Sequence, residues 1–254
     1  MSSRENVKKQ LEGAVFQTKN FGKIEVLEYY KASKVLVKFL DTGNEKYCHS
    51  SSIRDGNVKD RFAPTVCGVG IIGDEISRCN GVIDRCYDIW SSMLDRCFNE
   101  KLKQRYPTYR NCSMCDDWRY LSKFKEWYLH QIGHDQIGWC LDKDILVKGN
   151  KEYSPETCCF VPHQINCVVV SQKSSRGDNP VGVIFKKENK KFCAGLAVNG
   201  STHHLGYYDN NEQAWSAYKV AKETYIKDLA EKYKSSIDLR VYDALKSWKV
   251  EITD

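Results

Sequence analysis

The sequence predicts an α+β fold built from several modules, and three observations support this prediction. Between Gly13 and about Asp60, apolar residues recur with a period of two, which is typical of strands that bury one face. From Asp84 to Gln104, apolar residues fall at steps of three and four, which indicates an amphipathic helix. Near the C-terminus, three strand patterns within residues 181–208 precede a long helical pattern over residues 211–233.

The composition is that of a folded protein, and it does not specify the kind of partner that the protein binds. Of the 254 residues, 41% are apolar and 28% are charged, which argues against a disordered chain. The formal charge of +6 permits an anionic partner such as nucleic acid but does not require one. No apolar run reaches membrane-spanning length and the N-terminus has no signal-peptide core, so we expect no membrane partner. The 12 cysteines show no repeated spacing and are interpreted as reduced thiols.

The first module is predicted to be a small β-barrel over residues 1–67, with residues 1–10 as a charged lead-in. Turn signals such as Asp41-Thr42-Gly43-Asn44 separate short alternating strands, and this spacing favours a barrel or a strongly bent sheet. The pattern resembles the Src-homology-3-like barrels that open several phage DNA-associated proteins. A packing or protein-contact module is the alternative interpretation.

The second module, residues 68–170, is predicted to contain two helices followed by a compact core. The first helix carries Tyr87, Trp90, Met93 and Cys97 on one face. A second aromatic cluster, Trp118, Phe124 and Trp127, marks the second helix, and both clusters are expected to lie in the core. Cys112 and Cys115 form only half of a structural zinc site, and no second pair follows at a suitable spacing. Zinc is therefore not expected.

The core motif runs from Leu141 to Val161. It consists of a short apolar strand with acids at Asp142 and Asp144, a Gly149-Asn150 turn, and a helix start at Ser154-Pro155-Glu156. An acid on a strand that faces the start of a helix is a compact way to hold a divalent cation against a phosphate.

This motif, together with the preceding helices, resembles the ββα-metal core of phage-type His-Asn-His endonucleases. The resemblance implies Asp142 as a ligand for Mg²⁺ or Mn²⁺, with Asp144 as a second ligand on the same strand face. Lys143 stands where an active enzyme has its general-base histidine, and Thr157 stands where the helix usually has asparagine. A lysine of ordinary pKa is protonated at pH 7, so Lys143 suits DNA backbone contact better than catalysis. His163 is the alternative base, with a purely structural role as the other interpretation.

Three interpretations of this core stay open. It is an active nuclease with catalytic residues Asp142, Lys143 and His163, in which Asp142 holds the metal and Lys143 or His163 replaces the usual base, a scaffold that still binds DNA, or a fold reused for protein contact. Lys148, in the same loop as Lys143, is assigned with it to DNA contact.

The third module, residues 180–234, follows a polar linker at residues 171–179. Its three strands, the Asn199-Gly200 hairpin signal and the covering helix resemble the APETALA2-like DNA-binding domain. Residues 235–254 add a C-terminal helix with Leu239, Tyr242, Leu245 and Trp248 on one face.

Strand alternation predicts which side chains of this module face away from the helix and toward DNA. They are Ile184, Lys186, Cys193, Gly195, Ala197, Thr202 and His204. Lys187, Lys190 and Lys191 cluster in the first hairpin and are expected to meet phosphates, with a solvated turn as the alternative. The absence of arginine on this face predicts weak base readout.

The combined resemblance implies a bacteriophage protein of the infected cell cytoplasm that binds double-stranded DNA, with possible metal-dependent endonuclease activity of the homing type. The alternative is a non-catalytic phage factor that binds a host protein or a protein–DNA complex, for example to inhibit a defence or to regulate transcription.

Overall fold

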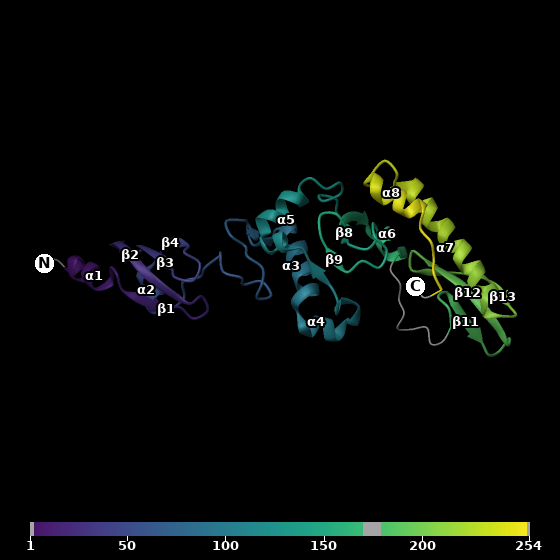
Figure 1. Ribbon diagram of the computed structural model, residues 1–254, viewed down its shortest axis with the longest axis horizontal. Helices are drawn as coiled ribbons and strands as arrows, with labels where there is room; N and C mark the ends of the chain where they lie inside the picture. The colour runs from purple at the N-terminus through teal and green to yellow at the C-terminus, as the bar shows by residue number, and fades with distance from the viewer. Residues whose placement is uncertain (1–2, 170–178, 253–254) are drawn as a thin grey trace. The chain divides into compact units, whose positions relative to one another are not determined.

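The computed structural model describes residues 3–169 and 179–252 (Figure 1), and it confirms a mixed α+β protein. The chain divides into two compact units. Unit 1 comprises Met1–Arg110 with Asp116–Lys125, and unit 2 comprises Asn111–Cys115 with Glu126–Asp254. Most of the predicted linker at residues 171–179 lies outside the described residues. Among the described helices, none is long and apolar enough to cross a membrane.

Unit 1 begins with an antiparallel sheet of four strands in the order β1-β2-β3-β4. Its elements are α1 (Ser3–Leu11), β1 (Val15–Gln17), β2 (Lys23–Lys31), β3 (Lys34–Phe39), β4 (Glu45–Cys48) and α2 (Ser50–Arg54). The predicted alternation is observed, because Ile24, Val26, Val35, Val37 and Phe39 are fully buried on one face. Leu11 at the end of α1 and Ile53 of α2 join the same core.

One expectation for this region is wrong. In the described residues the sheet does not close into a barrel, since β1 and β4 remain edge strands. Alternation in the sequence reports which face is buried, whereas barrel closure depends on pairing between the first and last strands, which alternation does not encode. The charged lead-in forms α1, and Leu11 at the end of this helix packs against the sheet.

The rest of unit 1 is helical around an aromatic centre. Its elements are β5 (Arg78–Cys79), β6 (Val82–Ile83), α3 (Arg85–Phe98), α4 (Glu100–Arg105), η1 (Pro107–Tyr109), η2 (Asp116–Arg119) and α5 (Leu121–Tyr128), of which α5 continues into unit 2. The indole Nε1 of Trp90 donates to the Trp118 carbonyl at 2.7 Å, and the Trp118 and Phe124 rings meet edge to face at 5.0 Å. The predicted helix of Asp84–Gln104 is interrupted at Asn99, whose side chain caps α4.

Unit 2 contains a small hairpin followed by a helix. Its elements are β7 (Ser113–Met114), β8 (Trp139–Asp142), β9 (Glu152–Tyr153), β10 (Cys159–Pro162) and α6 (His163–Val169). Strands β8 and β10 pair antiparallel, and β7 pairs parallel with β9. The helix predicted to start at Ser154 is not formed: Ser154–Thr157 make a turn, and the chain then enters β10. The local capping signal is overridden because the apolar run Cys159–Pro162 is buried completely by pairing with β8.

The C-terminal part of unit 2 is a three-stranded antiparallel sheet with a long helix lying along it (Figure 1). Its elements are β11 (Val183–Lys186), β12 (Lys191–Val198), β13 (Ser201–Tyr208), α7 (Asn211–Tyr233) and α8 (Leu239–Lys246). Asn199 and Gly200 both have positive φ, at 52° and 80°, as a tight two-residue hairpin turn requires. Ala214 and Tyr218 of α7 are buried in the core. Leu239, predicted on the packing face of the last helix, is exposed, and Val241 is buried instead.

One hydrophobic core runs through both parts of unit 2. Val161 and Ile165 of the hairpin and helix belong to the same buried cluster as Ala194 of the sheet and Ala214 of α7. The core hairpin and the C-terminal sheet therefore support each other directly.

Candidate functional site

Asp142 ends β8 and organises the loop that follows it. Its side chain is only 6% exposed. Its Oδ1 accepts hydrogen bonds from the backbone N–H groups of Asp144 and Ile145, both at 2.8 Å. Burial, and after it the nearby charge of Asp144, raise the pKa of this carboxyl to about 6 against the effect of the two N–H donors, which lower it. The residue is thus a loop anchor that carries a costly buried charge at neutral pH.

Lys143 is turned inward, which corrects its assignment to DNA contact and to the general-base position. The residue is 8% exposed. Its ammonium Nζ donates to the Asn150 carbonyl at 3.2 Å, lies 3.3 Å from the Asp144 carboxylate, and stands 5.8 Å from the centre of the Tyr153 ring. These contacts close the loop of residues 143–150 and hold the ammonium group inside it.

Asp144 does not lie on the strand, so the expected alternation of Asp142 and Asp144 on one face is wrong. Strand β8 ends at Asp142, and the chain bends through the next five residues. The Asp144 carboxylate turns to Lys143, while Asp142 is engaged by backbone N–H groups. Within the described residues, no group of three or more His, Cys, Asp or Glu side chains converges to hold a metal ion. The carboxylates of Asp142 and Asp144 are therefore engaged by different partners.

His163 lies at the other end of the hairpin from Asp142. The strand register pairs Asp142 with Cys159 and Trp139 with Pro162, and His163 follows Pro162 as the first residue of α6. Three residues of strand separate the two ends, which corresponds to roughly 10 Å. The structure brings Asp142, Lys143 and Asp144 together and leaves His163 apart, so His163 is not placed to act as the base for chemistry at Asp142.

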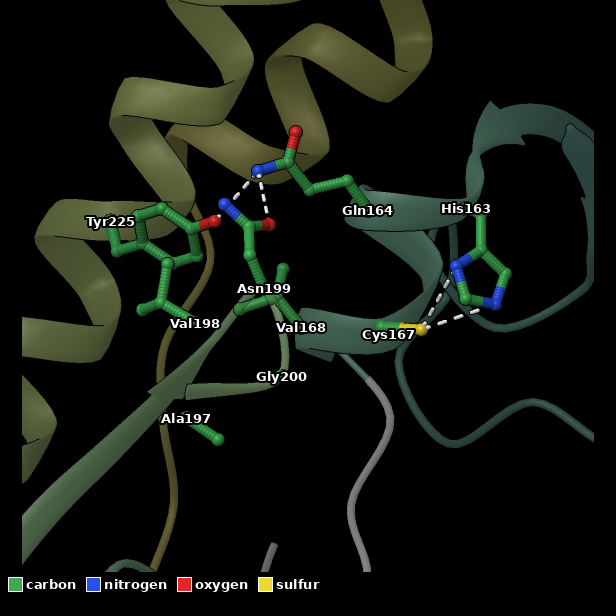
Figure 2. Close-up of a pocket in the computed structure, with 9 residues that line it drawn as sticks. All are labelled: His163, Gln164, Cys167, Val168, Ala197, Val198, Asn199, Gly200 and Tyr225. Carbon is green, nitrogen blue, oxygen red and sulfur yellow. Dashed lines mark hydrogen bonds between the residues drawn. The ribbon is translucent and has the colours of Figure 1, made fainter. Parts of the chain in front are cut away.

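His163 instead lines a pocket with a volume of ≈ 330 Å³ between α6 and the β12–β13 turn (Figure 2). The pocket is lined by His163, Gln164, Cys167, Val168, Ala197, Val198, Asn199, Gly200 and Tyr225. Sequence reasoning did not single out Gln164, Asn199 or Tyr225 as site residues. No sequence pattern connects them, because they come from α6, a hairpin turn and α7.

Lys148 is bound to the C-terminal segment. Its Nζ donates to the Lys249 carbonyl at 2.7 Å and lies 5.4 Å from the centre of the Trp248 ring. Its assigned role in DNA contact would require this hydrogen bond to be exchanged for a phosphate contact.

The face of the C-terminal sheet opposite α7 is open to solvent. The register places Ile184, Cys193 and Tyr207 in one row across the three strands, and Ile184 and Tyr207 are 60% and 48% exposed. The next rows pair Gly195 with His204 and Ala197 with Thr202. The Cys193 Sγ lies 3.3 Å from the His204 Nδ1, and the His204 ring packs on the Tyr207 ring at 4.7 Å.

Tyr207 was missed by strict alternation from His204. A β-bulge shifts the register between Ala194 and Gly195, so one extra residue separates His204 from the next row of β13. The shift turns Tyr207 onto the open face beside His204. Gly206 lies within this stretch and has a φ of 136°. A glycine inside a strand pattern is therefore the sequence signal of the irregular backbone.

Lysines gather at the end of the sheet where β11 and β12 join. Residues 181–208 contain four lysines and one glutamate, so their formal charge is three positive. Lys187 and Lys190 are exposed in the turn, and Lys186 is half-buried beside it. Lys191 forms an ion pair with Asp209 at 3.0 Å. Among the described residues, Lys186, Lys187 and Lys190 form no ion pair with an acidic side chain, and they stand at one end of the open face.

Comparison of the chain with models of protein families, with curated proteins and with solved structures gave no match. The function proposed below rests on the geometry and charge of the described residues.

Proposed function

We propose that the chain binds double-stranded DNA through the open face of the β11–β13 sheet, with the core hairpin serving as its scaffold. The observation that carries this proposal is the basic, acid-poor character of residues 181–208 on an exposed sheet. Lysines at one end of such a face supply the sequence-independent attraction to phosphates that dominates DNA affinity. Thr202 and His204 offer hydrogen-bonding groups further along the same face, where base edges or sugars would lie.

The test is a fluorescence-anisotropy titration of duplex DNA at several salt concentrations. Replacing Lys186, Lys187 and Lys190 with Ala is expected to weaken binding to all sequences alike. If all three contact phosphates, the slope of log affinity against log salt falls in magnitude by about 2.7, at about 0.9 per contact.

A matched variant controls for bulk charge. Lys227, Lys234 and Lys249 are three lysines of the same unit located on α7 or after it, away from the open face. Their triple replacement with Ala changes the net charge equally and is expected to leave the slope unchanged. An equal loss of slope in both variants would mean that the attraction is diffuse and that the open face is not the binding surface.

The scaffold role of the core predicts no cutting. Asp142 and Lys143 are buried and engaged, and His163 is separated from them. Supercoiled plasmid incubated with the protein and either Mg²⁺ or Mn²⁺ is expected to remain uncut. Nicking that is abolished by Asp142→Asn would instead support the metal-dependent endonuclease of the homing type.

A second candidate function, binding of a host protein, is favoured by an exposed apolar segment near the core hairpin. Leu129, Ile132 and Ile137 lie within nine residues of each other, and Ile137 is 96% exposed. Single exposed apolar residues are common, so the proposal is that these three side chains together form one contact surface. The wild type is expected to retain a bound host protein after the complex is treated with nuclease. The double variant Ile132→Ser, Ile137→Ser is expected to lose that protein. Retention of that protein by the double variant would exclude this segment as the contact.

A further inference from the structure

The pocket between α6 and the β12–β13 turn combines a thiol with an imidazole (Figure 2). Cys167 and His163 are one helical turn apart on α6, and the Cys167 Sγ lies 3.4 Å from each ring nitrogen of His163. Both residues are exposed, so a small molecule in solvent has direct access to the sulfur. The pair belongs neither to the open sheet face nor to the Asp142 loop.

Cys167 differs from the other cysteines of the chain. Of the 12 cysteines, only Cys79 and Cys167 are exposed. Burial raises the pKa of the Cys158 and Cys159 thiols, which keeps them protonated and inert. Within the described residues, no hydrogen bond joins Cys79 to a histidine, whereas Cys167 has His163 beside it. Cys79 is therefore an internal control for exposure without an adjacent base.

The pocket also contains amide and phenol groups, and it has no carboxylate in its lining. Gln164 Nε2 donates to Asn199 Oδ1 at 2.9 Å and to the Tyr225 hydroxyl at 2.8 Å (Figure 2). Gln164 Oε1 accepts from the Lys232 ammonium and from the Tyr233 hydroxyl, each at 3.0 Å. None of the nine lining residues is Asp or Glu. Amides, a phenol and a neighbouring ammonium suit a ligand that has peptide groups and negative charge.

We propose that Cys167 is a reactive thiol that exchanges with small anionic disulfides of the glutathione class, with His163 as its base. His163 takes the proton from Sγ, and the thiolate attacks one sulfur of the disulfide. The ligand's S–S bond breaks as the new bond to Sγ forms. The departing thiolate then takes the proton back from His163. Cys167 ends in a mixed disulfide, and one equivalent of ligand thiol is released.

The test uses the full-length reduced protein and oxidised glutathione at pH 7, with site-by-site rates from peptide mass mapping. Cys167 is expected to react at least about tenfold faster than Cys79, a threshold set below the roughly 10²–10⁴-fold that a positioned base typically contributes. His163→Ala and, as a second variant, His163→Gln are expected to bring the Cys167 rate to that of Cys79. Continued protection of Cys158 and Cys159 shows that the hairpin remains folded. A smaller ratio in the wild type, or an unchanged ratio in both folded variants, would overturn the proposal.

A second arm tests the class of ligand. Lys232→Ala is expected to slow the reaction with oxidised glutathione several-fold and to leave the reaction with neutral hydroxyethyl disulfide unchanged. Lys227→Ala, on the same helix, is the control and is expected to change neither rate. If Lys232→Ala affects both disulfides equally, or neither, the pocket does not select an anionic ligand, and that part of the proposal is wrong.

Discussion

The buried carboxyl of Asp142 makes a quantitative prediction about stability and pH. Its pKa of about 6 in the folded protein lies above the ordinary value of 3.8. Between these two values the folded state binds more protons than the unfolded state, so the free energy of unfolding falls as pH rises from about 4 to about 6. A difference of about two pKa units corresponds to about 3 kcal/mol, all of it lost by pH 7.

Asp142→Asn removes this dependence. The asparagine Oδ1 still accepts the N–H groups of Asp144 and Ile145, but no charge is buried. The new NH₂ group changes the free energy of unfolding by an amount that is independent of pH. The change in the free energy of unfolding between pH 4 and pH 7 is therefore the quantity to compare. Urea unfolding across this range is expected to show a decline for the wild type that is about 2–2.5 kcal/mol larger than for the variant, because a part of the full effect is already lost at pH 4.

A direct carboxyl titration by carbon-13 NMR provides the control. Asp144→Asn removes the negative charge that raises the Asp142 pKa, so the titration midpoint is expected to move down. An Asp142 midpoint at or below 4 in the wild type would refute the reasoning, as would equal pH profiles of unfolding for the wild type and Asp142→Asn.

Three further predictions follow from single contacts. Lys143→Ala is expected to destabilise unit 2 by about 1–3 kcal/mol in urea, because Asp144 and the Asn150 carbonyl lose their partner, and to leave DNA affinity unchanged by anisotropy. Gly70→Ala is expected to lower the melting temperature through a cost of about 1–3 kcal/mol, because a Cβ there would lie 2.4 Å from the Leu94 Cδ1; an unchanged melting temperature would contradict this packing. Asp209→Ala releases Lys191 from its ion pair and is expected to strengthen DNA binding and steepen the salt dependence by up to about 0.9; weaker binding would count against the open face as the DNA surface.

The C-terminal strands were predictable because their signals are local. Asn199-Gly200 specifies a two-residue hairpin on its own, and the long helix repeats its apolar positions over six turns. The bulge after Ala194 was not predictable by the same method, because alternation assumes a regular ladder. One inserted residue was enough to hide Tyr207 from the predicted face.

The central motif shows the opposite case. The sequence correctly grouped Asp142, Lys143 and Asp144, but their directions are set by the bend that Asp142 itself caps. The helix expected at Ser154 failed for a related reason: a capping signal contributes about 1 kcal/mol, and burial of the four residues of β10 contributes several times more. His163 was considered a possible base because it is near in sequence, whereas the antiparallel register places it at the far end of the hairpin.

The shared core of unit 2 gives the hairpin a role that needs no chemistry at Asp142. Ile145, which follows the Asp142 turn, is buried in the same cluster as Val183 and Ala194 of the sheet. The loop is also joined to the C-terminal segment through Lys148 and the Lys249 carbonyl. Because Asp142 accepts the N–H of Ile145, its side chain positions a residue of the core on which the sheet packs. Loss of this turn is therefore expected to weaken DNA binding through the sheet's stability, with an unchanged salt slope, which distinguishes a scaffold from a phosphate contact.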